Sequence, residues 1–188
     1  MSEAADRRVC FVTQQYPPDR SGHASRMGEL STALADGEWT VHALAPPPAF
    51  PHGEFDREWT PVQRTDHEGV TVHQLWAWQP TEPDPSTVSR LAYYVTFALV
   101  ATIWLAWHHR RYDAVVTTTP PISTGVAGFV PSLLGTTWVV DVRDRWIDAS
   151  VSLGFIRPGG LAEKGARLFQ RTVLRAATAV STTTETLG

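Results

Sequence analysis

Short apolar runs alternate along this chain with longer stretches of helical periodicity, and this alternation limits the possible folds more than any other feature. The first run, residues 9–12, is rich in β-branched and aromatic side chains, which is typical of a strand buried on both faces of a parallel sheet. A polar loop follows it, and Met27, Leu30 and Leu34 then recur at helical spacing. Residues 8–35 are therefore predicted to form a strand, a loop and a helix.

The same order repeats to the end of the chain. Apolar runs predict further strands over residues 39–45, 70–75, 114–118, 137–140 and 179–182, and helices are predicted over residues 86–107, 123–134 and 161–176. Residues 46–61 hold too many prolines for regular structure and are expected to form a long connection. The alternation predicts an α/β fold, a single Rossmann-like doubly wound parallel sheet flanked by helices, in which ligands bind at the carboxyl ends of the strands.

Composition narrows the class of protein. A chain of 188 residues with 43% apolar and 19% charged residues is long enough for one sizeable core. Its formal charge of −3 arises from scattered residues, so no basic patch indicates binding to nucleic acid. Cys10 is the only cysteine and lies in the first apolar run, which predicts a buried thiol, no internal disulfide and a reducing compartment. The polar N-terminus lacks the apolar core of a signal peptide, which predicts a cytoplasmic protein.

Residues 91–107 form the most apolar passage of the chain and carry no charge. The run is slightly short for a membrane-spanning helix, and the first interpretation is a helix buried on most faces. The alternative is a peripheral membrane contact, in which one helix face rests in the interface of a bilayer beside lipid head groups. That face would carry Tyr93, Tyr94, Trp104 and Trp107, with Arg110 and Arg111 at its basic end.

The start of the first helix is a candidate anion site. N–H groups in a first helical turn lack partners within the helix, and Gly22 would let a phosphate approach them closely. The alternative is a solvated turn in which Gly22 is a flexible joint. A full G-x-G-x-x-G sequence is absent after the first strand, which argues against a dinucleotide site and against a nicotinamide-dependent oxidoreductase.

The densest group of charges at any predicted strand end includes Asp141, Arg143 and Asp144. One carboxylate could stay ionised beside the arginine while the other accepts a proton from a hydroxyl, so these three residues are the candidate catalytic group. The alternative is a surface salt-bridge network or a cap on the following turn. The dispersed histidines predict no metal site, and G-x-S-x-G, P-loop and D-x-D sequences are absent.

Three short motifs, in a fixed order, carry a resemblance to a known family. They are Tyr16-Pro17-Pro18 followed by Gly22, Arg26 and Leu30, then Thr119-Pro120-Pro121 after a later strand, and Arg143-Asp144-x-Trp146 after the next one. With these motifs the chain resembles the N-terminal, acceptor-side domain of family 4 glycosyltransferases of the GT-B fold. The resemblance covers essentially the whole chain.

This resemblance implies retaining transfer of a sugar from a nucleotide diphosphate sugar to a glycan or polyprenyl-linked acceptor, without a metal or another cofactor. It implies that Ser21, Gly22 and His23 reach the diphosphate of the donor. It also implies that Asp144 stands where many relatives have a histidine near the anomeric carbon. The residues expected on this basis to bind substrate are Tyr16, Ser21, Gly22, His23, Arg26, Thr119, Pro120 and Trp146.

Two departures from the family pattern bear on function. The family's Gly-Gly is Ser21-Gly22 here, and the sequence ends where the linker to a second domain is expected. The resemblance therefore implies that residues 1–188 are the N-terminal domain and that donor binding needs a C-terminal domain or a partner chain. This chain alone is then expected to be inactive, and to work in the cytoplasm or at the inner face of the cell membrane. The alternative function is a non-catalytic module that docks on a membrane or binds the partner of a split transferase.

Overall fold

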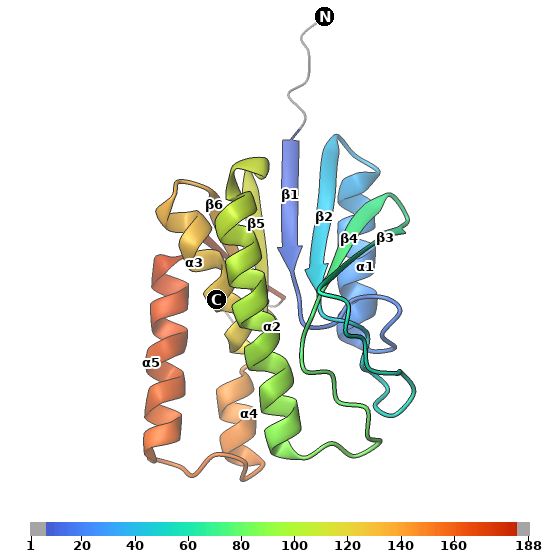
Figure 1. Ribbon diagram of the computed structural model, residues 1–188. Helices are drawn as coiled ribbons and strands as arrows, with labels where there is room; N and C mark the ends of the chain where they lie inside the picture. The colour runs from blue at the N-terminus through green and yellow to red at the C-terminus, as the bar shows by residue number, and fades with distance from the viewer. Residues whose placement is uncertain (1–6, 184–188) are drawn as a thin grey trace, which may run out of the picture.

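The computed structural model describes residues 7–183, which form a seven-stranded sheet with the strand order β3-β4-β2-β1-β5-β6-β7 (Figure 1). Neighbouring strands are parallel except β3 and β4, which are antiparallel. The strands are β1 Arg7–Val12, β2 Trp39–Ala45, β3 Val62–His67, β4 Val70–Leu75, β5 Ala114–Thr119, β6 Thr137–Val142 and β7 Ala179–Thr182. The predicted Rossmann-like α/β sheet is confirmed, with one antiparallel edge strand added to it.

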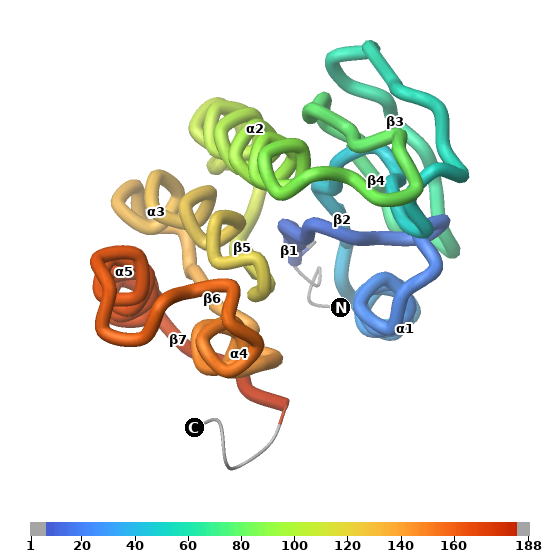
Figure 2. Tube along the Cα trace, turned by 90° about the horizontal axis from the view of Figure 1, so that it is seen from below, coloured from blue at the N-terminus to red at the C-terminus, as the bar shows by residue number. Residues whose placement is uncertain are grey.

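Helices cover both faces of this sheet. Figure 2 shows α1 on one face and α2, α3 and α5 on the other, whereas α4 lies beyond the carboxyl ends of the strands beside α5. The helices are α1 Gly22–Ala35, α2 Thr87–His108, α3 Val126–Leu133, α4 Trp146–Ser152 and α5 Leu161–Ala176, with short 3₁₀ helices η1 His109–Arg111 and η2 Ile122–Gly125. The central strands are buried between these layers: Phe11 packs with Met27 of α1, and Val12 packs with the α2 side of the core.

Two elements lie in stretches for which the sequence predicts none. β3 is mostly exposed and polar, so no hydrophobic pattern marks it. It forms because Glu68 and Gly69, with φ of 50° and 83°, turn the chain back so that Thr65 pairs with Val72 of β4. α4 has only 7 residues, which is too short for its helical periodicity to be recognised in the sequence.

The prediction that the apolar helix is buried on most faces is wrong. α2 buries one face, which packs on the sheet through Phe97, Ala101 and Leu105. Tyr93 is buried with this face and Trp104 packs beside it, so the expected bilayer face is divided between core and surface. The exposed apolar residues form an outer stripe along the helix, made of Val88, Leu91, Val95, Leu99, Ile103 and Trp107. Both sides of the helix are apolar, so periodicity could not show which side the sheet covers.

Together α2 and η1 form the segment Thr87–Arg111, which has a mean hydropathy of 1.5. Among residues 7–183, this is the one helical segment that is long and apolar enough to cross a membrane. The core helix of a soluble domain meets the same criterion. Because its inner face packs against the sheet and against α3, α2 is an integral helix of this domain.

A cluster of stacked rings joins the sheet to the end of α2. Nδ1 of His42 lies 3.1 Å from Nε2 of His73, and the His73 ring lies 5.0 Å from the ring of Trp104. Burial, reinforced by the positive charges of His42 and Arg64, lowers the pKa of His73 to about 4. The folded chain therefore binds a proton at His73 less readily than the unfolded chain does.

Folding stability should consequently fall as the pH drops from about 6.5, the pKa of an unfolded histidine, towards about 4. Because His73 is only half-buried, we expect it to account for a loss of about 1–2 kcal/mol in the free energy of unfolding. Urea unfolding at about pH 7.5 and about pH 4.5 measures this loss. Between these two pH values, the free energy of unfolding should fall less in His73→Gln than in the wild type, by the amount attributed to His73. An equal fall in the variant and the wild type would contradict the prediction.

Candidate functional site

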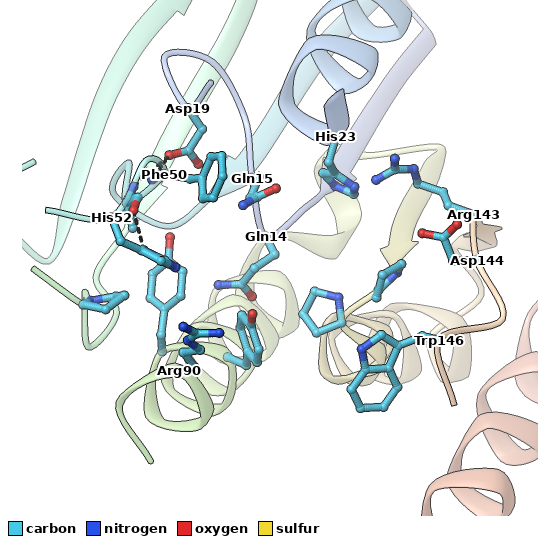
Figure 3. Close-up of a pocket in the computed structure, with 16 residues that line it drawn as sticks. Gln14, Gln15, Asp19, His23, Phe50, His52, Arg90, Arg143, Asp144 and Trp146 are labelled. Atoms are coloured by element: carbon cyan, nitrogen blue, oxygen red, sulfur yellow. Dashed lines mark hydrogen bonds between the residues drawn. The ribbon is translucent and has the colours of Figure 1, made fainter. Parts of the chain in front are cut away.

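A pocket lies at the carboxyl edge of the sheet, where the topology predicts a ligand site. It has a volume of about 320 Å³ and lies among the loops after β1, β2, β5 and β6 and the first half of α2. Figure 3 shows its 16 lining residues, many of which are charged or carry amides or imidazoles. We call it the polar pocket.

Asp19 fixes the loop after β1. Its Oδ1 accepts hydrogen bonds from the backbone N–H groups of Ala49 and Phe50, at 2.8 and 2.7 Å. Burial raises the pKa of Asp19 to about 6, and these backbone hydrogen bonds oppose the shift. The loops after β1 and β2 are thereby joined into one wall of the polar pocket. In the sequence, Asp19 is only one residue of the polar loop that follows the first strand.

Gln14 is the clearest sign that the polar pocket binds a ligand. The residue is only 2% exposed, and neither atom of its side-chain amide makes a hydrogen bond of normal geometry within the described part of the chain, although the amide lies close to the hydroxyl of Tyr93. Figure 3 places this amide near the middle of the pocket. A buried amide without partners costs about 1–3 kcal/mol, so a bound ligand that supplies partners would recover this cost. Nothing in the sequence distinguishes Gln14 except that it follows the first strand.

The first turn of α1 brings His23 to another wall of the pocket. Ser21 caps this helix, because its Oγ accepts a hydrogen bond from the backbone N–H of Ala24 at 3.1 Å. His23 is nearly buried, and its Nε2 lies 2.6 Å from Oγ1 of Thr13, which fixes the ring. No heavy atom lies within 4 Å of the position that a Cβ on Gly22 would occupy, so the helix start faces open space.

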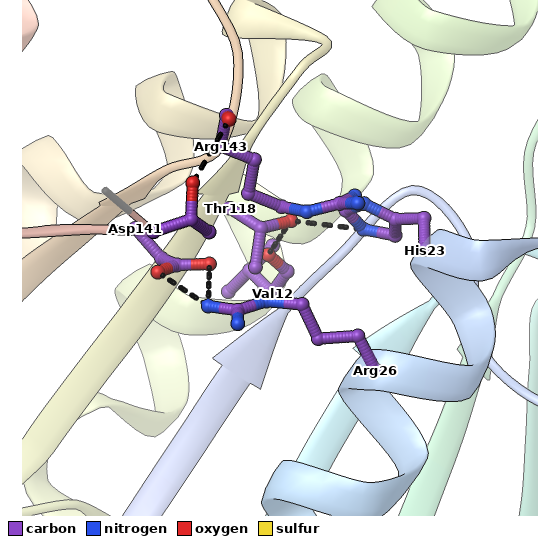
Figure 4. Close-up of polar contacts among 7 residues, drawn as sticks. Val12, His23, Arg26, Thr118, Asp141 and Arg143 are labelled. Carbon is purple, nitrogen blue, oxygen red and sulfur yellow. Dashed lines mark hydrogen bonds and ion pairs between the residues drawn. The ribbon is translucent and has the colours of Figure 1, made fainter. Parts of the chain in front are cut away.

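Arg143 and Asp144 follow β6 and form the wall beside His23. The guanidinium of Arg143 extends towards His23 (Figure 4), and its buried Nε has no hydrogen-bond partner among residues 7–183. Burial lowers the pKa of Arg143, and the negative charge of Asp144 opposes that shift. Asp144 is exposed on the pocket wall, so a ligand can reach its carboxylate.

Asp141 does not join this group, which corrects the predicted catalytic trio. It lies inside β6 and is 2% exposed. Its two carboxylate oxygens accept hydrogen bonds from Nη2 of Arg26, at 3.1 and 3.2 Å (Figure 4). Because residue 141 precedes the end of the strand, α1 covers it and Arg26 of that helix becomes its partner. The pair joins helix to sheet, and neither residue lines the polar pocket.

The remaining residues that were expected to bind substrate divide between pocket and core. Pro120 and Trp146 line the pocket. Tyr16 is buried under α1, where its hydroxyl oxygen lies 2.7 Å from Oγ of Ser31. The structure thus brings His23, Pro120, Arg143, Asp144 and Trp146 together in the pocket lining, and it leaves Tyr16, Ser21, Gly22, Arg26, Thr119 and Asp141 outside that lining.

The chemistry of the polar pocket suits an organic ligand with hydroxyl and anionic groups. Arg90 and Arg143 supply cations, and Asp144 and Gln14 supply acceptors. In the described part of the chain, no three His, Cys, Asp or Glu side chains are grouped so as to hold a metal ion.

Known structures include one with a similar fold. The chain is similar to the catalytic domain of starch synthase IV from Arabidopsis thaliana bound to ADP and acarbose, with a TM-score of 0.54 and 12% sequence identity. The match covers 74% of this chain and 34% of the starch synthase chain, so this chain spans about a third of the protein that it matches. The likeness shows that the matched part of the chain has the fold of a GT-B glycosyltransferase domain.

Sequence comparison gives the family. No curated protein sequence matches the chain. The sequence model of the glycosyl transferase 4-like domain, however, matches residues 21–188, which is most of the chain and includes His23 and Asp144 of the polar pocket, whereas Gln14, Gln15 and Asp19 precede the matched range. The chain therefore belongs to the glycosyl transferase 4-like domain family.

Proposed function

We propose that this chain is the acceptor-binding half of a retaining glycosyltransferase, which moves a sugar from a nucleotide diphosphate sugar to a glycan or lipid-linked acceptor. Membership of the family and the GT-B fold support a transferase. The starch synthase structure contains ADP and acarbose, which supports a sugar nucleotide as the donor. That protein is about three times as long as the part matched here, which supports a donor-binding half supplied by a C-terminal domain or a partner chain.

The proposal depends most on the unpaired buried groups of the polar pocket. The Gln14 amide offers two donors and an acceptor, and Nε of Arg143 offers another donor. The hydroxyl groups of a sugar both donate and accept hydrogen bonds, so a sugar-like acceptor offers both kinds of partner that these groups lack. An apolar ligand in the same pocket would leave them buried and unpaired.

In this proposal, Asp144 accepts a hydrogen bond from the acceptor hydroxyl and orients it towards the anomeric carbon. Its negative charge also stabilises the positive character that develops at that carbon. Arg143 binds a phosphate or carboxylate group. The first turn of α1, at Ser21 and Gly22, faces the diphosphate of the donor, where unpaired N–H groups favour negative charge.

Asp144→Asn is expected to lower kcat/KM about tenfold in an assay that supplies the donor-binding half, because an amide loses the charge-assisted hydrogen bond to the hydroxyl. Initial rates of sugar transfer measure the effect. Asp36→Asn is the matched control, since Asp36 is exposed at the C-terminal end of α1, away from the pocket, and its rate should equal that of the wild type.

The exposed outer stripe of α2 favours a second function, a non-catalytic module that docks on the inner face of the membrane or recruits a separate donor-binding chain. The same assay separates the two functions. Transfer that is unchanged in Asp144→Asn would remove the role given to this carboxylate, and transfer that proceeds equally well when this chain is left out of the assay would favour the second function.

A further inference from the structure

An apolar groove opens beside the polar pocket. It has a volume of about 450 Å³ and lies between the start of α2, η2 and the segment after α4. Its walls are mainly apolar, with Leu91 and Val95 from α2, Ile122 from η2, and Phe155 and Ile156 from the segment after α4. Leu91 and Phe155 are exposed by 59% and 80%, so much of the apolar surface of these two lining residues faces solvent.

The groove and the polar pocket are continuous. Four residues line both of them, namely Arg90, Tyr94, Pro121 and Trp146. Nε of Arg90 donates to the carbonyl of Pro85 at 3.0 Å, and its Nη2 donates to Asp84 at 3.2 Å, which holds the guanidinium at this junction. Asp84 is almost fully exposed, so the ion pair is well solvated. The guanidinium of Arg90, with the exposed carboxylate of Asp84 beside it, therefore marks the boundary between the polar and the apolar region.

We propose that this groove binds the apolar chain of an amphiphilic acceptor, with an anionic linking group at Arg90 and a hydroxyl-bearing head in the polar pocket. The inference rests on the proposed function and narrows the acceptor to a compound with an aliphatic or isoprenoid chain. Such a chain, lying along Leu91 and Val95, would cover apolar surface that a hydrophilic acceptor leaves in water. The outer stripe continues from these two residues along α2, so a longer chain would find further apolar surface.

Alkyl phosphates of increasing length serve as probes, because they carry the anion and the chain but no sugar. Butyl, hexyl and octyl phosphate, below their micellar concentrations, are titrated into the 188-residue chain by isothermal calorimetry. We expect the affinity to rise about threefold for each added methylene, because each one enters apolar surroundings. Octyl glucoside should bind more weakly than octyl phosphate, and Arg90→Gln should remove that difference.

Two variants of α2 form a matched pair. Leu91 and Leu99 are exposed to a similar extent, 59% and 56%, and both belong to the outer stripe, but only Leu91 lines the groove. Leu91→Gln should lower the affinity for octyl phosphate about fivefold, since a polar amide replaces apolar contact with the chain. Leu99→Gln makes the same substitution in the same helix and should leave the affinity unchanged.

Three results would overturn the inference. They are equal affinities for butyl and octyl phosphate, equal losses in Leu91→Gln and Leu99→Gln, and a dimer in light scattering that Leu91→Gln converts to monomers, since a second copy would then occupy the groove. None of these results alters the expected effect of Asp144→Asn on sugar transfer. Failure of the inference is thereby distinguished from failure of the proposed function.

Discussion

Replacing Gly128 with alanine is expected to destabilise the folded chain by about 3 kcal/mol. Gly128 lies in α3, and a Cβ added there would come within 2.1 Å of two atoms of the Trp138 ring. That ring cannot yield easily, because it is fully buried and its Nε1 donates a hydrogen bond to Oγ1 of Thr117 at 2.9 Å. The added methyl must therefore push α3 away from β6. The midpoint of urea unfolding, followed by circular dichroism, measures the loss.

Gly165→Ala provides the matched control, because Gly165 lies in the middle of α5 and an added Cβ there meets no atom within 4 Å. Alanine has a higher helix propensity than glycine, so this variant should be more stable than the wild type by about 0.5–1 kcal/mol. The two substitutions are chemically identical and differ only in the space available. A Gly128→Ala protein as stable as the wild type would show that α3 does not pack on Trp138 as described.

The central strands could be predicted from the sequence because burial on both faces requires an apolar run. β1 and β6 were predicted to within two residues at each end. β3 could not be predicted, because its backbone pairing with β4 stabilises it and its side chains contribute little burial. For α2 the sequence showed the helix but not its orientation, since Phe97 on the inner face and Leu99 on the outer face are both apolar.

The location of the site, at one edge of the sheet, could be predicted from the sequence, but the contacts among its side chains could not. Parallel strands end at one edge, so the sequence could place His23 and Asp144 near one another. Asp141 was grouped with them because the predicted strand ended at residue 140, whereas β6 continues to Val142 and carries Asp141 under α1. The contribution of Gln14 depends on burial by segments that are distant in sequence, and no local pattern signals such burial.

Arg26→Met should cost about 3 kcal/mol, because it leaves the Asp141 carboxylate buried without the guanidinium that pairs with it. The side chain of Asp141 is 3% exposed, whereas that of Arg26 is 38% exposed, so the cost arises mainly from the aspartate. The double variant Arg26→Met, Asp141→Leu should recover most of the lost stability, since removing both members of a buried ion pair leaves no unpaired charge. Urea unfolding of the wild type, the single variant and the double variant measures both effects.

Arg20→Met is the control for loss of an arginine as such. Arg20 forms an ion pair with Glu54, and the two side chains are 64% and 51% exposed. Water solvates both members of this pair, so its loss should change stability by less than about 1 kcal/mol. If Arg26→Met is as mild as Arg20→Met, then water or another group reaches Asp141 and this carboxylate is not sealed between α1 and β6. If instead only Arg26→Met is costly, then burial of the Asp141 carboxylate, rather than the loss of an ion pair as such, determines the loss of folding stability. Asp141 then belongs to the framework that holds α1 and β6 at the pocket.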